Sequence, residues 1–187
     1  MSRRKPYPSD PSDARWALFE PTASVIDTQS VKTSTNVPLT SQGTDAAKKI
    51  AGRERGIITD TLGLLLAVTV TAASRSENAV GIHLLDQARK TCPTISKSWV
   101  DTGFKNPVIE HGAKLGIDVE VVNRNPEIRG LHVVKRRWVV ERSIGRIKMH
   151  RRLARDYETL AASSEAVIHI ASIDNLTKRI TDDTTPT

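Results

Sequence analysis

Short apolar runs separated by polar segments predict alternating strands and helices along this chain. Strands are expected in five runs that are rich in Val, Ile and Leu or that alternate with polar residues: 23–27, 56–59, 64–70, 95–101 and 117–122. Helices are expected where apolar residues recur every three or four positions: 12–19, 77–90, 107–115, 138–152 and 163–180. Because a hairpin precedes strand–helix–strand units, this order indicates an α/β protein with a mixed sheet.

The runs at 56–59 and 64–70 predict an antiparallel β-hairpin. Asp60-Thr61-Leu62-Gly63 lies between them, with Asp and Gly at positions that suit a tight turn. The second run is continuously apolar, so its strand is expected to be buried on both faces of the sheet.

The segment from Lys32 to Gly56 is polar and has neither a helical nor a strand period. A loop of this length inside a domain is uncommon and is usually either functional or disordered. Four basic residues lie in its second half: Lys48, Lys49, Arg53 and Arg55. They either contact an anion or belong to a solvated basic loop, and the pattern leaves both interpretations open.

Positive charge is concentrated in one part of the chain. The 187 residues include 28 Lys and Arg against 21 Asp and Glu, a net charge of +7, and the stretch from Arg124 to Glu158 carries the whole excess. Such a block indicates either a polyanionic partner or a solvated helix face. Charge alone does not choose between them.

Composition and missing motifs exclude several classes of protein. The run 62–70 is about half of the ~20 apolar residues that a membrane span needs, and the basic N-terminus leads into no apolar stretch. The single cysteine, Cys92, excludes internal disulfides and multi-cysteine zinc sites. The glycine-rich nucleotide-binding loops and the nucleophile turn of hydrolases are missing from the sequence. A soluble, cytoplasmic protein with no membrane partner is expected.

Two aspartates stand at predicted strand ends. Asp27 and Asp101 each follow an apolar strand, and ligand sites in open α/β sheets lie beyond the carboxyl ends of the strands. Either residue alone is more often a turn residue than a functional one.

The basic helix predicted at 138–152 supplies a third acid. At 100° per residue around the helix axis, Glu141 lies beside the stripe of core positions. Lys148 lies two turns further along the helix, within about 20° of the direction of Glu141. Gly145 leaves space between them and costs about 1 kcal/mol of helix stability relative to Ala. That cost is tolerable if a ligand approaches the helix closely, which favours a functional face.

Several motifs in this order resemble bacterial insertion-sequence transposases of the DDE type. The segment 25–33, Val-Ile-Asp-Thr-Gln-Ser-Val-Lys-Thr, is similar to their first-aspartate strand, and 99–104, Trp-Val-Asp-Thr-Gly-Phe, to their second-aspartate motif. Around the third acid these transposases carry Tyr-x2-Arg-x3-Glu-x6-Lys, and Arg137, Glu141 and Lys148 stand at those spacings. The resemblance runs from about residue 24 to 179. It implies a ribonuclease H-like fold, in which helices flank a mixed sheet.

The resemblance implies a set of catalytic residues that also bind the metal ions: Asp27, Asp101 and Glu141. It implies a set of DNA contacts: Arg137, Lys148, Arg151 and Arg152. Two divalent ions, Mg²⁺ or Mn²⁺, activate the attacking oxygen and stabilise the leaving one when a phosphodiester is displaced. The implied function is metal-dependent DNA strand cleavage and strand transfer during transposition. Transposon ends and target DNA are the implied partners, and a homo-oligomer is compatible with this function.

The chain departs from the family in two places. Val134 stands where the family has Tyr. Residues 7–18 resemble the opening of the family's N-terminal region, yet the first catalytic strand follows within ten residues, as in an internally deleted copy. The expected divisions are an N-terminal remnant at 1–22, a catalytic domain at 23–181 and a disordered tail at 182–187. Two alternatives remain open: a catalytically silent DNA-binding remnant, and a ribonuclease H-like nuclease of cellular origin.

Overall fold

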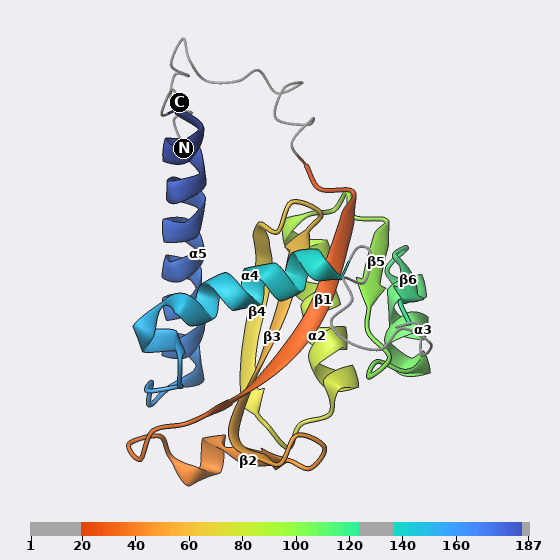
Figure 1. Ribbon diagram of the computed structural model, residues 1–187. Helices are drawn as coiled ribbons and strands as arrows, with labels where there is room; N and C mark the ends of the chain where they lie inside the picture. The colour runs from red at the N-terminus through yellow and green to blue at the C-terminus, as the bar shows by residue number, and fades with distance from the viewer. Residues whose placement is uncertain (1–19, 124–136, 185–187) are drawn as a thin grey trace, which may run out of the picture.

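A mixed six-stranded β-sheet forms the centre of the computed structural model, which describes residues 20–123 and 137–184 (Figure 1). The strands are β1 (Ala23–Lys32), β2 (Gly43–Asp45), β3 (Ile50–Asp60), β4 (Leu65–Ala72), β5 (Lys97–Val100) and β6 (Asp118–Val121). Strands β1, β3 and β4 are antiparallel neighbours, β2 pairs with the start of β3, and β5 and β6 extend the sheet from β1 in parallel. The predicted hairpin and crossovers are confirmed.

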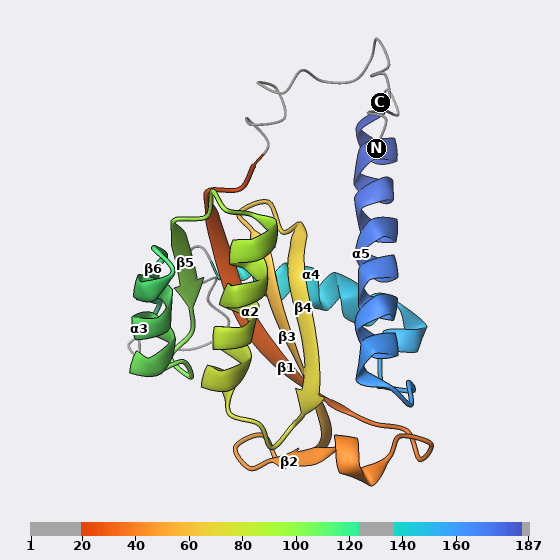
Figure 2. The same cartoon turned by 180° about the vertical axis from the view of Figure 1, so that it is seen from behind.

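Helices cover both faces of this sheet (Figures 1 and 2). On one face lie α2 (Glu77–Thr91) and α3 (Asn106–Lys114), and on the other lie α4 (Trp138–Met149) and α5 (Ala161–Thr184). Because side chains alternate along a strand, Ile26 joins the core under α2, whereas its neighbour Val25 joins the core under α4. The expected arrangement of a mixed sheet flanked by helices is confirmed.

The predicted turn closes the β3–β4 hairpin. The Asp60 carboxylate accepts the backbone N–H groups of Leu62 (2.9 Å) and Leu64 (2.8 Å), and Gly63 takes a positive φ of 86°. Strand β4 contributes Ala67 to one core and Val68 to the other, so the prediction that it is buried on both faces is also confirmed.

The polar segment 32–56 is not the long loop that was predicted. It contains the short helix η1 (Leu39–Ser41), strand β2 and the first half of β3. Arg53, Glu54 and Arg55 lie inside β3 and are buried, with no exposed surface on either arginine. Sequence periodicity misses this half-strand because its buried side chains are charged rather than apolar.

Backbone carbonyls and one carboxylate compensate the buried arginines. Arg53 donates to the carbonyls of Glu158 (2.7 Å) and Thr159 (2.9 Å) and forms an ion pair with buried Asp156 (3.4 Å). Arg55 donates to the carbonyl of Leu153 (2.7 Å). The two side chains thereby fix the irregular segment between α4 and α5 to the sheet.

Several element ends differ from the prediction. Strand β1 continues for five residues beyond Asp27, and the helix predicted to end at Arg152 ends at Met149, followed by the short helix η2 (Arg151–Leu153). Helix α5 runs to Thr184 and so includes residues that were assigned to the tail. The helix predicted at 12–19 and residues 185–187 lie outside the described residues. Within the described ranges, no helix is both long and apolar enough to cross a membrane.

Candidate active site

The parallel register of β1 and β5 places Asp27 beside Asp101. Val25 pairs with Trp99, and each aspartate stands two residues further along its strand. Because side chains alternate in direction, both aspartates share the face of Val25 and Trp99, which belongs to the core under α4. Asp101 follows the end of β5, as predicted, whereas Asp27 lies within β1 rather than at its end.

The first turn of α4 brings Glu141 and Arg137 to the same place. Helix α4 crosses the sheet over β1 (Figure 1). The Nη2 atom of Arg137 lies 3.5 Å from Oδ2 of Asp101 and 3.3 Å from Oε1 of Glu141. The Arg137 side chain is only 14% exposed. One mostly buried guanidinium therefore joins two of the three predicted acids.

Asp27 lies in an environment that disfavours a negative charge. Burial raises its pKa from 3.8 to about 6, against the backbone N–H of Thr28 and the charge of Arg137, which both lower it. The negative charges of Asp101 and Glu141 add to the rise. The three acids therefore interact, and a cation bound among them would stabilise the ionised form of Asp27.

A pocket of about 250 Å³ opens between β1 and α4. Its lining includes Asp27, Glu141 and Ile144, and Lys48 comes in from the segment between β2 and β3. The Lys48 ammonium lies 3.4 Å from Asp45 and 3.5 Å from Glu77. Burial opposes the charge on Lys48, but the carboxylates of Glu77 and Asp45 raise its pKa above the usual value. The pocket thus presents two acids and one held cation to solvent.

The loop after β5 is shaped by the absence of a side chain at Gly103. A Cβ built there would lie 2.0 Å from Oε2 of Glu77 and 2.9 Å from Oδ1 of Asp101. The backbone N–H of Gly103 donates to that same Oδ1 atom at 2.7 Å. The hydrogen bond from Gly103 orients Asp101, and a larger residue at this position would have to displace the Glu77 carboxylate.

The donor set fits a hard divalent cation. Asp27, Asp101 and Glu141 offer carboxylate oxygens, the ligands that Mg²⁺ and Mn²⁺ prefer. Across residues 20–123 and 137–184, no three His, Cys, Asp or Glu side chains are grouped closely enough to hold a metal ion as they stand. In this arrangement the positive guanidinium of Arg137 neutralises the negative charges of Asp101 and Glu141.

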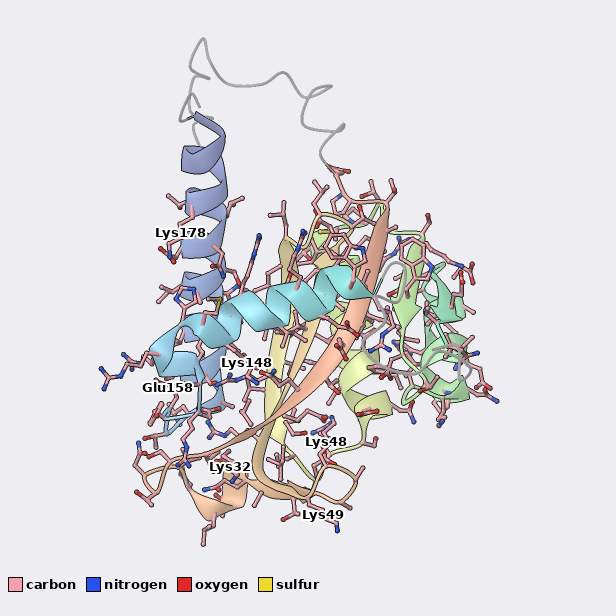
Figure 3. All side chains as sticks on the ribbon, viewed as in Figure 1. Lys32, Lys48, Lys49, Lys148, Glu158 and Lys178 are labelled. Carbon is pink, nitrogen blue, oxygen red and sulfur yellow. The ribbon has the colours of Figure 1, made fainter. Side chains whose placement is uncertain are left out.

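The other predicted DNA contacts lie further along α4 and beyond it. Lys148 is exposed and projects from α4 on the face where Lys48 also lies (Figure 3). It does not belong to the described lining of the acidic pocket. Arg151 and Arg152 are exposed on η2, and Arg152 Nε donates to Glu158 at 2.8 Å. The structure thus brings Arg137 to the acids and leaves these three cations outside the pocket.

Two residues at the site were not among the predicted site residues. Lys48 appeared in the sequence only as part of a basic segment, because its distance from Asp27 along the chain hides their proximity. Glu77 stands in the first turn of α2, behind the N-cap Ser76. An acid at that position is ordinarily explained by the helix dipole, so the sequence carries no signal for its approach to the site.

Comparisons with known proteins found one matching family model and similar solved structures. The chain matches the family model described as "Transposase DDE domain" over residues 18–176. Its structure is similar to the catalytic core domain of BIV integrase, with a TM-score of 0.45 and 13% sequence identity, over 81% of each chain. No curated protein matches the sequence.

Proposed function

Because the chain belongs to the transposase DDE domain family, we propose that Asp27, Asp101 and Glu141 form its catalytic triad. The protein is a transposase domain that acts on DNA with a divalent metal ion. The observation that carries the triad is the ion-pair bridge at Arg137, which joins Asp101 to Glu141, together with the electrostatic interaction of all three residues with the partly buried Asp27. The stability of the fold does not require acids from three distant segments of the chain to lie near one guanidinium, so their proximity favours a functional role.

Mg²⁺ or Mn²⁺ would be held by the oxygens of the three carboxylates. When bound, such ions supply Lewis-acid activation of the attacking hydroxyl or water and charge stabilisation at phosphorus. The Asp27 carboxylate, whose burial disfavours a free negative charge, would gain most from this partner. Arg137 would then be free to leave Asp101 and to bind a phosphate oxygen next to the scissile bond.

The surrounding cations bind the DNA backbone in this proposal. Lys48 lines the pocket beside Asp27, so it would contact the phosphate nearest the reacting bond. Lys148, Arg151 and Arg152 would bind phosphates further along the duplex, where their exposure lets them follow the backbone. Each phosphate contact releases counterions, so DNA binding should weaken steeply as salt is raised.

Transposition joins two ends of one element to one target, so a homo-oligomer that presents two such sites is the form we expect on DNA. The catalytic domain in this proposal spans 23–181, and the cytoplasm is its expected location.

Nicking of supercoiled plasmid with Mg²⁺ or Mn²⁺ at low salt tests the assignment. Glu141→Gln and Asp101→Asn should each abolish nicking while leaving DNA retention unchanged, because they remove metal ligands and not phosphate contacts. Glu110→Gln is the matched control, since Glu110 is an exposed acid on α3 that does not belong to the described lining of the acidic pocket. Metal-dependent nicking that survives in both variants would refute the triad. Salt-sensitive binding without any nicking by the wild type would identify the protein as a silent DNA-binding remnant.

A further inference from the structure

Two carboxylates hold the ammonium of Lys48 in the acidic pocket. The Nζ atom of this lysine lies 3.4 Å from Oδ2 of Asp45 and 3.5 Å from Oε1 of Glu77. The same lysine lines the pocket together with Asp27. A phosphate needs only the cation, so the two acids that hold it have no role in the catalytic proposal as it stands.

Both of these acids are themselves bound to strand β1. The Ser30 hydroxyl donates to Oδ2 of Asp45 at 2.6 Å, and the Thr28 hydroxyl donates to Oε1 of Glu77 at 3.3 Å. Because Thr28 and Ser30 stand two positions apart on β1, their side chains leave the same face of the strand. Thr28 directly follows Asp27. The lysine is therefore held by two acids that are fixed to the strand of the first aspartate.

The backbone that carries Lys48 is fixed as well. Lys48 belongs to the short connection 46–49 between β2 and β3, and Oδ1 of Asp45 accepts the backbone N–H groups of Ala47 and Lys48 at 3.0 Å each. The hydrogen bonds from Ser30 and from the backbone of Lys48 lower the pKa of Asp45 from 3.8 to about 2, so this anchor is ionised at neutral pH. Asp45 thus binds both the backbone and the side chain of the lysine.

Holding the lysine in advance suits a group that must stabilise charge during a reaction. A free lysine side chain loses rotamer freedom when it binds a phosphate, whereas here that loss already occurs on folding. Charges that are oriented beforehand stabilise a transition state without reorganising during the reaction. The Lys48 side chain is 40% exposed, so solvent screens its ion pairs and a phosphate can still reach the ammonium.

We propose that Asp45 and Glu77 are positioning residues for the transposase reaction, which hold Lys48 where it binds the phosphate next to the scissile bond. This inference rests on the proposed function, in which DNA is cleaved at the acidic pocket. Neither acid contacts the phosphate, and each acts through the lysine. Glu77 also lies close to the Gly103 loop that carries Asp101, so the test must trace its effect to the lysine.

Metal-dependent plasmid nicking at saturating DNA measures the role of each residue. Lys48→Met should lower the rate about a hundredfold, as removal of one oriented charge-stabilising donor typically does. Glu77→Gln and Asp45→Asn should each lower the rate about tenfold, because the lysine is then present but misplaced. The KM for DNA should change little, since many phosphate contacts share the binding. Lys49→Met is the matched control: Lys49 is exposed and outside the described lining of the pocket, so the rate should not change.

Double variants separate positioning through the lysine from any other role. Once Lys48 is Met, no ammonium remains to be misplaced, so adding Glu77→Gln or Asp45→Asn should slow nicking no further. A further loss in either double variant overturns the positioning role of that acid. A faster rate in Glu77→Gln overturns it as well, because the acid would then withhold the lysine from DNA. An unchanged rate in Lys48→Met overturns the inference, whereas loss of nicking in Asp101→Asn would still support the triad.

Acetylation of the full chain by acetic anhydride, followed by mass spectrometry, gives a readout that needs no cleavage. Although burial opposes its charge, the carboxylates of Glu77 and Asp45 raise the pKa of Lys48 above the usual value, so less free amine is present to react. Lys48 should therefore react more slowly than Lys49, and Glu77→Gln should narrow the difference. Plasmid DNA at low salt should protect Lys48 more than Lys49. Equal reactivity of the two lysines, or equal protection by DNA, overturns the proposal even for a protein that does not nick.

Discussion

Replacing Arg53 by Met should destabilise the protein strongly without touching the acidic pocket. The Arg53 guanidinium has no exposed surface. It donates to the carbonyls of Glu158 and Thr159 and to the hydroxyl of Ser41 (2.7 Å), and it pairs with Asp156, which is equally buried. Methionine preserves much of the volume of the side chain but none of these interactions.

The magnitude follows from what Arg53→Met leaves behind. Asp156 keeps its hydrogen bonds from the Ser164 hydroxyl (2.9 Å) and the backbone N–H of Glu158 (3.0 Å) but loses its ion pair with Arg53. Removing one member of a buried ion pair typically costs about 3–5 kcal/mol, because a buried charge is left uncompensated. Since a domain of this kind is stable by about 5–15 kcal/mol, the variant should lose a large share of its stability.

Urea unfolding followed by circular dichroism measures this loss. Arg75→Met is the control, because Arg75 is exposed beyond the end of β4, and it should change the free energy of unfolding by less than about 0.5 kcal/mol. The double variant Arg53→Met/Asp156→Asn should be more stable than Arg53→Met alone, since the uncompensated charge is gone. A cost below about 1 kcal/mol for Arg53→Met, or no recovery in the double variant, would refute the reasoning.

Two further predictions concern Glu54 and Gly145. Burial raises the pKa of Glu54 from 4.5 to about 7. Between these two pH values the folded protein binds a proton that the unfolded chain does not, so the folded state gains stability from protonation of Glu54. This gain is lost as the pH rises from about 4.5 through 7. Glu54→Gln should therefore flatten the pH dependence of the free energy of unfolding between pH 5 and 8 by on the order of 2 kcal/mol; an unchanged profile would contradict the assignment. A Cβ at Gly145 would meet nothing within 4 Å. Gly145→Ala should raise the free energy of unfolding by about 1 kcal/mol and yet slow plasmid nicking, and unimpaired nicking would show that DNA does not approach the helix there.

The sequence was sufficient to predict those turns, helix starts and strands that depend on residues close together in the chain. The β3–β4 turn forms because Asp60 caps the backbone and Gly63 adopts a positive φ, and both residues are visible in the sequence. Helix α2 begins where Ser76 accepts the N–H of Ala79. The continuous apolar run of β4 predicts a strand that is buried on both faces of the sheet, as the structure shows. Motif spacing was enough to select Asp27, Asp101 and Glu141 as candidates, although not to show that they meet.

Only the tertiary structure decided what depends on partners far along the chain. Arg53 and Arg55 read as loop residues because a buried strand is expected to be apolar, and the carbonyls that compensate them lie about a hundred positions later. The approach of Asp27 to Asp101 follows from the register of β1 and β5, and the bridge from Asp101 to Glu141 follows from where α4 crosses the sheet. Periodicity reports which side of an element is buried, but the packing of one element on another decides which residue lies opposite.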